Sequence, residues 1–277
     1  MRRGAGAAFL GVGAVVVVAT VGYFVLRDSD RFFPASDECT VEVDGHRVDL
    51  TVEQAENAAL ITAISVRRGM PARAASIALA TAYQESKLTN IEYGDRDSIG
   101  LFQQRPSQGW GTREQIMDPV YATNAFYDAL DRVDGYESLE ITVAAQEVQR
   151  SAFPSAYADH EADARALASA LTGHSPSTFG CDVDRATSSG RTDLVRRELA
   201  KLFDAPARVD GRTATVRTAD DQQAWAIAHY LVAMADRLEV HSVRVRDRVW
   251  VAGDGDRWRQ DPDGRGPRGR VLVAVGS

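Results

Sequence analysis

Gln84-Glu85-Ser86 and Gly100-Leu101-Phe102-Gln103-Gln104 bound the stretch on which the predicted fold and function both depend. Glu85 ends an alanine-rich segment with the composition of a buried helix, and a polar loop rich in turn formers separates it from the Gly-Leu-Phe-Gln turn. A carboxyl group at such a place is partly removed from water. This raises its pKa and keeps it protonated long enough to act as a general acid. We therefore interpret Glu85 as a candidate acid for glycosidic bond cleavage.

The residues around this stretch predict a helical domain. Residues 72–86 are rich in alanine, and Ile77, Thr81 and Glu85 recur at a spacing of four, so they share one face of a helix. That face points Glu85 from the domain interior toward the following loop. Over residues 50–172 we expect helices joined by short connections, which together form an all-α core.

The N-terminus carries an uncharged run, residues 4–26, behind Met1-Arg2-Arg3. The run is long enough for a hydrocarbon core of roughly 30 Å, which takes about 20 apolar residues. The arginines favour the cytoplasmic side. We therefore expect residues 1–27 to be a cytoplasmic N-terminus and transmembrane anchor of a single-pass cell-membrane protein, with the main domains extracytoplasmic. A cleaved signal peptide is the alternative, but no small-x-small site follows the run cleanly.

The chain has two cysteines, Cys39 and Cys181. Outside the cytoplasm such a pair is more often bonded than free, and closing so long a loop contributes roughly 4–5 kcal/mol in the chain-entropy model. The alternative is two unrelated buried thiols. A disulfide would mark the two ends of one domain.

Composition divides the chain beyond the anchor into a tether and two domains. Residues 28–38 are charged and predict a tether, and residues 39–182 predict the helical domain, which opens with a hairpin signal at Asp44-Gly45. Residues 191–277 alternate between helix and strand patterns, so we expect a small α+β domain and a mainly α protein. Helices are expected near 192–203 and 220–238, and strands near 213–216, 240–245, 249–252 and 271–275.

Charge and histidine usage restrict the function classes. The chain has 32 Lys+Arg against 39 Asp+Glu, and its net charge of −7 disfavours a nucleic-acid partner. The histidines are scattered without metal-ligand spacing, so we expect neither a metal site nor a cofactor. We interpret five arginines near the C-terminus as a solvated basic face, with attraction to anionic wall polymers as the alternative: Arg257, Arg259, Arg265, Arg268 and Arg270.

The two motifs in this order resemble those of the soluble lytic transglycosylases of the lysozyme-like superfamily, which includes goose-type lysozyme. In that group a Glu-Ser at a helix end is followed by a Gly-Leu-hydrophobic-Gln turn, and the resemblance covers roughly residues 50–172. The string from Tyr93 to Thr112, together with residues 149–154, is similar to a subgroup found in bacterial cell-surface proteins.

The resemblance implies a lysozyme-like fold and cleavage of the β-1,4 bond between N-acetylmuramic acid and N-acetylglucosamine in peptidoglycan glycan strands. Glu85 would protonate the leaving oxygen. In transglycosylases the same glutamate then takes the proton of the muramyl 6-hydroxyl, and a 1,6-anhydro product forms. A hydrolase would use a second carboxylate to position water, for which Asp95 and Asp97 are the nearby candidates.

Further residues near Glu85 have side chains suited to a sugar polymer. The amides of Gln103 and Gln104 match acetamido and hydroxyl groups, and the rings of Tyr93 and Trp110 offer stacking faces. By family analogy Ser86 orients the glutamate or contacts substrate. The ordinary alternatives are a helix-end glutamate, turn-forming aspartates and a tryptophan that packs a lid. The candidate substrate-binding residues are Ser86, Tyr93, Asp97, Gln103, Gln104 and Trp110.

One motif departs from the family. Lytic transglycosylases carry an Ala-Tyr-Asn-containing helix whose tyrosine helps to orient the glutamate, and the corresponding stretch here is Ala144–Gln149. A glutamine takes over that role, or the site has become a binder. We thus predict a membrane-anchored peptidoglycan glycosidase, with a non-catalytic peptidoglycan-binding or scaffold protein as the alternative. A transport accessory is a third class, but a single span without intramembrane charges forms no carrier pathway.

Overall fold

An antiparallel hairpin opens the part of the chain that the computed structural model describes, residues 37–150, 156–185, 191–264, 266 and 268–276. Strands β1 (Glu38–Val43) and β2 (His46–Thr51) pair along their length. The two turn residues between them, Asp44 and Gly45, both have positive φ, as a two-residue hairpin loop of this type requires. The predicted hairpin is confirmed.

Helices follow where the alanine-rich pattern predicts them. Helix α3 spans Ala72–Ser86, the expected range, and its small buried residues allow α6 and α7 to approach closely. Helix α2 begins after Thr51, whose hydroxyl accepts from the Gln54 N–H while the Gln54 side chain accepts from the Thr51 N–H. The helical elements of this part are α2 (Val52–Arg67), α3, η2 (Pro106–Gln108), α4 (Arg113–Ile116), α5 (Pro119–Leu130), α6 (Ile141–Gln149), η3 (Ala156–His160) and α7 (Glu161–Leu171).

The all-α prediction for residues 39–182 is wrong, because a third strand joins the hairpin. Strand β3 (Phe179–Asp182) pairs antiparallel with β1 and gives a sheet of order β2-β1-β3. β3 escaped prediction because it is short, contains Gly180 and lies in a Ser-, Thr- and Gly-rich segment that is typical of a loop. Its partner strand is far away in the sequence, so no local pattern indicates the pairing.

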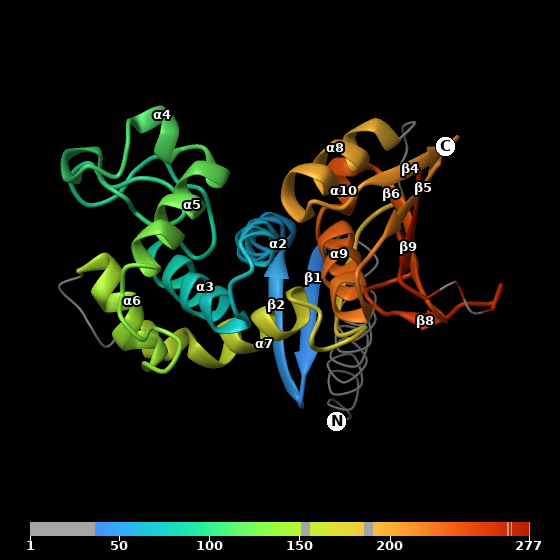
Figure 1. Ribbon diagram of the computed structural model, residues 1–277, viewed down its shortest axis with the longest axis horizontal. Coiled ribbons are helices and arrows are strands. Elements are labelled where there is room, and N and C mark those ends of the chain that lie inside the picture. Colours follow the sequence, from blue (N-terminus) through green and yellow to red (C-terminus); the bar gives the residue numbers. More distant parts are fainter. Residues whose placement is uncertain (1–36, 151–155, 186–190, 265, 267, 277) are drawn as a thin grey trace, which may run out of the picture. The chain divides into compact units, whose positions relative to one another are not determined.

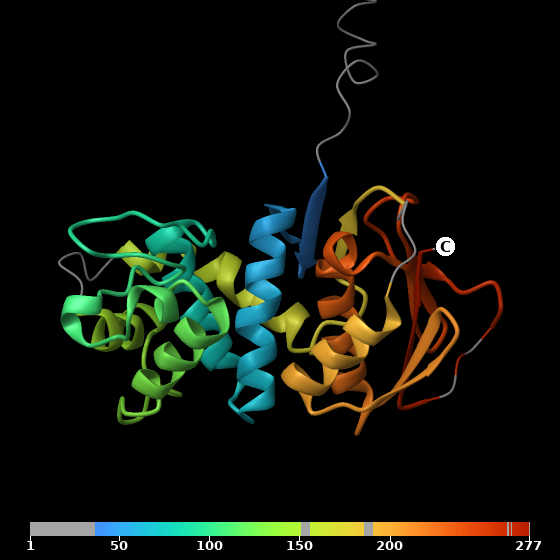
Figure 2. The same ribbon diagram turned by 90° about the horizontal axis from the view of Figure 1, so that it is seen from above.

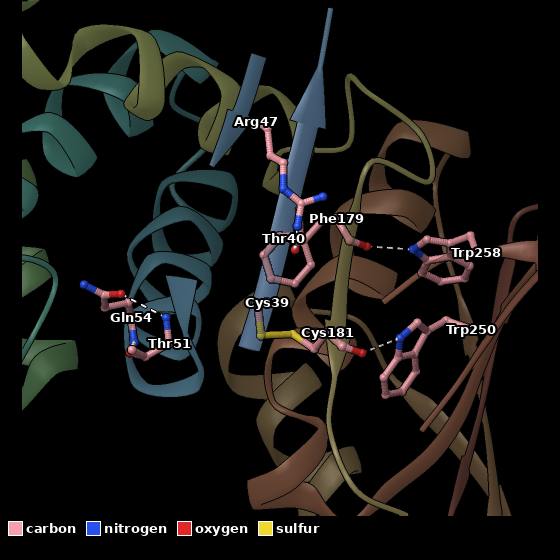
Figure 3. The surroundings of a disulfide bond; sticks show 9 residues. All are labelled: Cys39, Thr40, Arg47, Thr51, Gln54, Phe179, Cys181, Trp250 and Trp258. Carbon is pink, nitrogen blue, oxygen red and sulfur yellow. Dashed lines mark hydrogen bonds between the residues drawn. A yellow bond between two sulfur atoms is a disulfide. The ribbon is translucent and has the colours of Figure 1, made fainter. Parts of the chain in front are cut away.

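The predicted disulfide is confirmed. Cys39 and Cys181 stand directly opposite each other in the β1–β3 register, with their Cα atoms 3.9 Å apart, and they are bonded (Figure 3). This pairing is compatible with an extracytoplasmic location. It also closes a covalent loop that contains helices α2 to α7, which we term the helical part.

The C-terminal part has the α+β character expected from the sequence. Its strands form an antiparallel sheet of order β4-β5-β9-β6-β7-β8, and α9 and α8 lie between this sheet and α2 (Figure 1). The structure therefore contains two antiparallel sheets, which corrects the mainly α fold class. The elements are α8 (Thr192–Phe203), β4 (Ala207–Asp210), β5 (Thr213–Arg217), α9 (Asp221–Ala233), α10 (Ala235–Leu238), β6 (Val240–Val245), β7 (Arg248–Val251), β8 (Arg259–Gln260) and β9 (Arg270–Val275).

The predicted domains 39–182 and 191–277 meet along a shared core. Helix α2 packs against α3 and α5 on one side and against α8 and α9 on the other (Figure 2). The outer edge of β3 is covered by two indoles: Trp250 Nε1 donates to the Cys181 carbonyl at 3.0 Å, and Trp258 Nε1 donates to the Phe179 carbonyl at 2.7 Å (Figure 3). Residues 37–277 thus form one compact unit.

The predicted single-pass membrane topology must also be corrected. Over the described residues no helix combines the length and the apolar character needed to cross a membrane. The longest of them, α2 and α3, have 16 and 15 residues, whereas a span takes about 20. Their apolar surface is used in the protein core instead. The apolar run at 4–26 lies outside the described residues.

Candidate active site

Glu85 occupies the last turn of α3, as the sequence predicts. Ile77 and Thr81 on the same helix face are fully buried, and Glu85 is half-buried. The helix stops sharply after Ser86 because Lys87 and Leu88 both adopt positive φ, and the Leu88 N–H bonds back to the Ala82 carbonyl. The chain therefore turns away at once and leaves the Glu85 carboxyl at the rim of the core.

Two side chains from other elements converge on the Glu85 carboxyl. The Tyr157 hydroxyl, on η3, donates to Glu85 Oε1 at 2.7 Å. The side chain of Gln149, the last residue of α6, hydrogen-bonds to the same carboxyl, and its amide donates to the Phe102 carbonyl at 2.8 Å. Burial raises the pKa of Glu85, and the hydrogen bonds from Tyr157 and Gln149 lower it without cancelling the effect of burial. The site is thus a desolvated carboxyl held in one orientation, as a general acid requires.

Tyr157 is the residue that sequence reasoning missed. The family pattern places the orienting tyrosine near 144–149, where this chain has none, and the structure brings one from the next element instead. Tyr157 lies in the short 3-10 turn that directly precedes α7. Nothing in the local sequence pattern links it to Glu85. The His160 ring, on the same turn, stacks on Tyr83 with 4.7 Å between ring centroids and its Nε2 lies 2.9 Å from Gln84 Oε1. These contacts pin the turn that carries Tyr157 against α3.

The Gly-Leu-Phe-Gln turn is built against the end of α3. The Ile99 N–H donates to the Gln104 carbonyl at 3.1 Å and closes the turn. Gly100 has a φ of 79°, and a Cβ there would lie 2.9 Å from the Ile116 carbonyl oxygen, so this position requires glycine. The Phe102 ring stacks on Phe126 with 4.6 Å between centroids. These contacts fix the carbonyl that receives the Gln149 amide.

Three of the predicted substrate-binding side chains bond to the protein itself. The Ser86 hydroxyl is buried and donates to the Leu101 carbonyl at 2.8 Å, which ties the helix end to the turn. Gln104 is 1% exposed and its amide donates to the Ala122 carbonyl at 3.0 Å. The amide of Gln103 donates to the Tyr93 carbonyl at 3.2 Å. In this structure they support the site, and contact with substrate stays a prediction.

Asp97 anchors the loop that follows Glu85. Its carboxylate accepts from Arg105 Nε at 2.8 Å and from the backbone and hydroxyl of Ser107 at 2.8 and 3.0 Å. These bonds hold the pKa of Asp97 well below its ordinary value. Asp95 and Tyr93 on the same loop are exposed, the latter by 75%. Asp97 is thus occupied in loop structure, and Asp95 is solvated.

A cleft of about 920 Å³ lies next to the C-terminal end of α6. Gln149, which touches Glu85, forms part of its wall, and the half-buried Trp110 forms another part. The cleft is large enough for a ligand of several rings. Its further lining residues include Gln108, Arg132, Asp134, Val143, Glu147 and Arg150.

The described part of the chain shows no cluster of His, Cys, Asp or Glu suited to a metal ion. The geometry defines a half-buried carboxyl that is held by Tyr157 and Gln149, and Gln149 also forms part of the wall of an open cleft. The chain matches no protein-family model, and no curated protein shows significant similarity to it.

Proposed function

We propose that this protein cleaves the glycan strands of peptidoglycan with Glu85 as general acid and base. The observation that carries the proposal is the half-buried Glu85 carboxyl, whose pKa is raised by burial. Tyr157 and Gln149 hold it, and Gln149 also lines a ligand-sized cleft. The resemblance of the Glu-Ser and Gly-Leu-Phe-Gln motifs supplies the substrate class.

In the proposed reaction the protonated Glu85 gives its proton to the leaving glycosidic oxygen as the C1–O bond breaks. The carboxylate that results is the form that the Tyr157 O–H and the Gln149 amide stabilise most, because hydrogen bonds to ionised groups are the stronger ones. Glu85 then takes the proton of the muramyl 6-hydroxyl while that oxygen bonds to C1. The acid is regenerated and a 1,6-anhydro end is released.

The surroundings of Glu85 favour this route over hydrolysis. A hydrolase needs a second carboxylate to position water or trap the sugar. Of the two sequence candidates, Asp97 is engaged by Arg105 and Ser107, and Asp95 is exposed. A single-glutamate transglycosylase needs neither of them.

The test is mass spectrometry of fragments released from purified peptidoglycan by the full chain. We expect 1,6-anhydro ends from the wild type, a loss of at least about 100-fold with Glu85→Gln, and no change with Glu137→Gln, an exposed control. Reducing ends would identify a muramidase. Binding without release would identify a non-catalytic binder, and undiminished release by Glu85→Gln would remove Glu85 from the chemistry.

A further inference from the structure

The six-stranded sheet turns one face toward the helices and the other away from them. Along β5 and β9 the residues alternate strictly: Val216 and Val271 are buried on the helix side, whereas Thr215 and Leu272 are only half-buried on the opposite side. A shallow depression of about 260 Å³ lies on this second face, which we term the outer face; Leu272 forms part of its lining.

Three arginines gather at one end of the outer face. Arg217 on β5 and Arg270 on β9 stand directly opposite each other in the antiparallel register, and the Thr218 N–H bond to the Gly269 carbonyl continues the ladder beyond them. Arg208 on β4 pairs with Thr215, which places it diagonally from Arg217, at roughly 7–8 Å in a typical sheet. All three side chains are exposed.

This arrangement is unfavourable for the sheet itself. Like charges directly opposite on one face of an antiparallel pair repel each other and destabilise the pairing. Within the described residues, neither Arg217 nor Arg270 has an acidic partner, and the same holds for Arg208. By contrast, Arg244 of the same sheet is neutralised by Asp263 at 2.8 Å. An unfavourable cross-strand pair of like charges that no acidic side chain offsets is typical of a binding site.

We infer that Arg208, Arg217 and Arg270 bind a phosphodiester-linked polyol polymer outside the cytoplasm. A guanidinium presents a planar fork of donors that matches phosphate oxygens. Three cations on three neighbouring strands fit a chain that carries a charge at each repeat better than one small acid. The hydroxyls of Thr213 and Thr215 on the same face suit the polyol between phosphates.

Phosphate could also come from nucleic acid, but one observation favours the polyol polymer. The Cys39–Cys181 disulfide is typical of compartments outside the cytosol, where nucleic acid is scarce. The inference rests on the sheet and is independent of Glu85, so it stands or falls separately from the proposed glycosidase activity.

The test is fluorescence anisotropy of labelled poly(glycerol phosphate) titrated with the full chain over a range of salt concentrations. We expect Arg270→Gln to raise Kd at least about fivefold and to lower the slope of log Kd against log salt by about one. Arg196→Gln, an exposed arginine of α8, makes the same charge change elsewhere and should leave Kd unchanged within twofold. Equal affinity of wild type and Arg270→Gln would overturn the inference.

A second readout separates binding from a structural role. Because the Arg217–Arg270 pair is repulsive, Arg270→Gln should raise Tm by about 1–3 °C, and polymer should raise the Tm of the wild type but not of the variant. A fall in Tm would show that the arginine supports the sheet and would overturn the inference. Tighter binding of single-stranded DNA, or equal binding of polyglutamate, would contradict the choice of a polyol phosphate.

Discussion

Removing the disulfide with Cys39→Ala/Cys181→Ala should destabilise this protein by about 3–5 kcal/mol. The two cysteines are 142 residues apart, and the chain-entropy model assigns roughly 5 kcal/mol to closing a loop of that length. Removal of a native disulfide typically costs about 2–5 kcal/mol, and the length of this loop places the expected loss in the upper part of that range. The loop contains all three residues of the carboxyl site, so the loss should reach the site as well.

Urea unfolding followed by tryptophan fluorescence measures this loss directly. Trp250 is fully buried and donates to the Cys181 carbonyl, so its emission reports on the strand that carries the bond. With a slope of about 2–3 kcal/mol/M, the midpoint should fall by roughly 1–2.5 M. Dithiothreitol should shift the wild type in the same direction and leave the double variant unchanged. A loss under about 1 kcal/mol would refute the reasoning that loop closure stabilises the helical part.

Three further variants probe the site and the strand edge. Tyr157→Phe removes a hydrogen bond that lowers the pKa of Glu85, so the alkaline limb of the pH–activity profile should move to higher pH. Burial raises the pKa of Glu85 above its ordinary value of 4.5, so ionising Glu85 in the folded protein costs stability as the pH rises past 4.5. The Tm of Glu85→Gln should therefore be higher than that of the wild type at pH 7 and equal to it near pH 4. Trp258→Phe leaves the buried Phe179 carbonyl without its hydrogen-bond donor and should lower the free energy of unfolding in urea by about 1–3 kcal/mol.

Matched variants control these measurements. Tyr121→Phe should leave the pH–activity profile unchanged, because among the described residues Tyr121 makes no hydrogen bond to Glu85. Trp225→Phe removes an indole that donates no hydrogen bond to the described residues and should cost less than Trp258→Phe. An unshifted profile for Tyr157→Phe would contradict the role of Tyr157 at Glu85. An unchanged Tm for Glu85→Gln at pH 7 would contradict the raised pKa of Glu85.

Local signals in the sequence predicted the elements that local physics controls. The alanine-rich run of 72–86 forms α3 because small side chains with helical propensity suit a buried helix, and Asp44-Gly45 forms a hairpin turn because both residues tolerate positive φ. The disulfide was predicted from compartment and count alone. The C-terminal helices and most strands followed from their alternating patterns.

Features that depend on distant partners were missed. Strand β3 exists because β1 and two indoles of the C-terminal part satisfy its backbone, and none of these is near it in sequence. The intramolecular partners of Gln103 and Gln104 were also not indicated by the sequence: the folded turn directs their amides to backbone carbonyls, and their contact with substrate stays a prediction. Composition indicates which groups are available, and packing decides what they bond to.

The sequence by itself determined that an acid stands at the end of a buried helix, because hydrophobic spacing and the residues that stop the helix are local properties of the chain around Glu85. Only the tertiary structure decided what holds that acid. Tyr157 and Gln149 reach it from two other elements, and the desolvation that raises its pKa arises from the packing of all three elements together. An orienting hydrogen bond between residues 72 positions apart depends on the folded path of the chain, which no local pattern records.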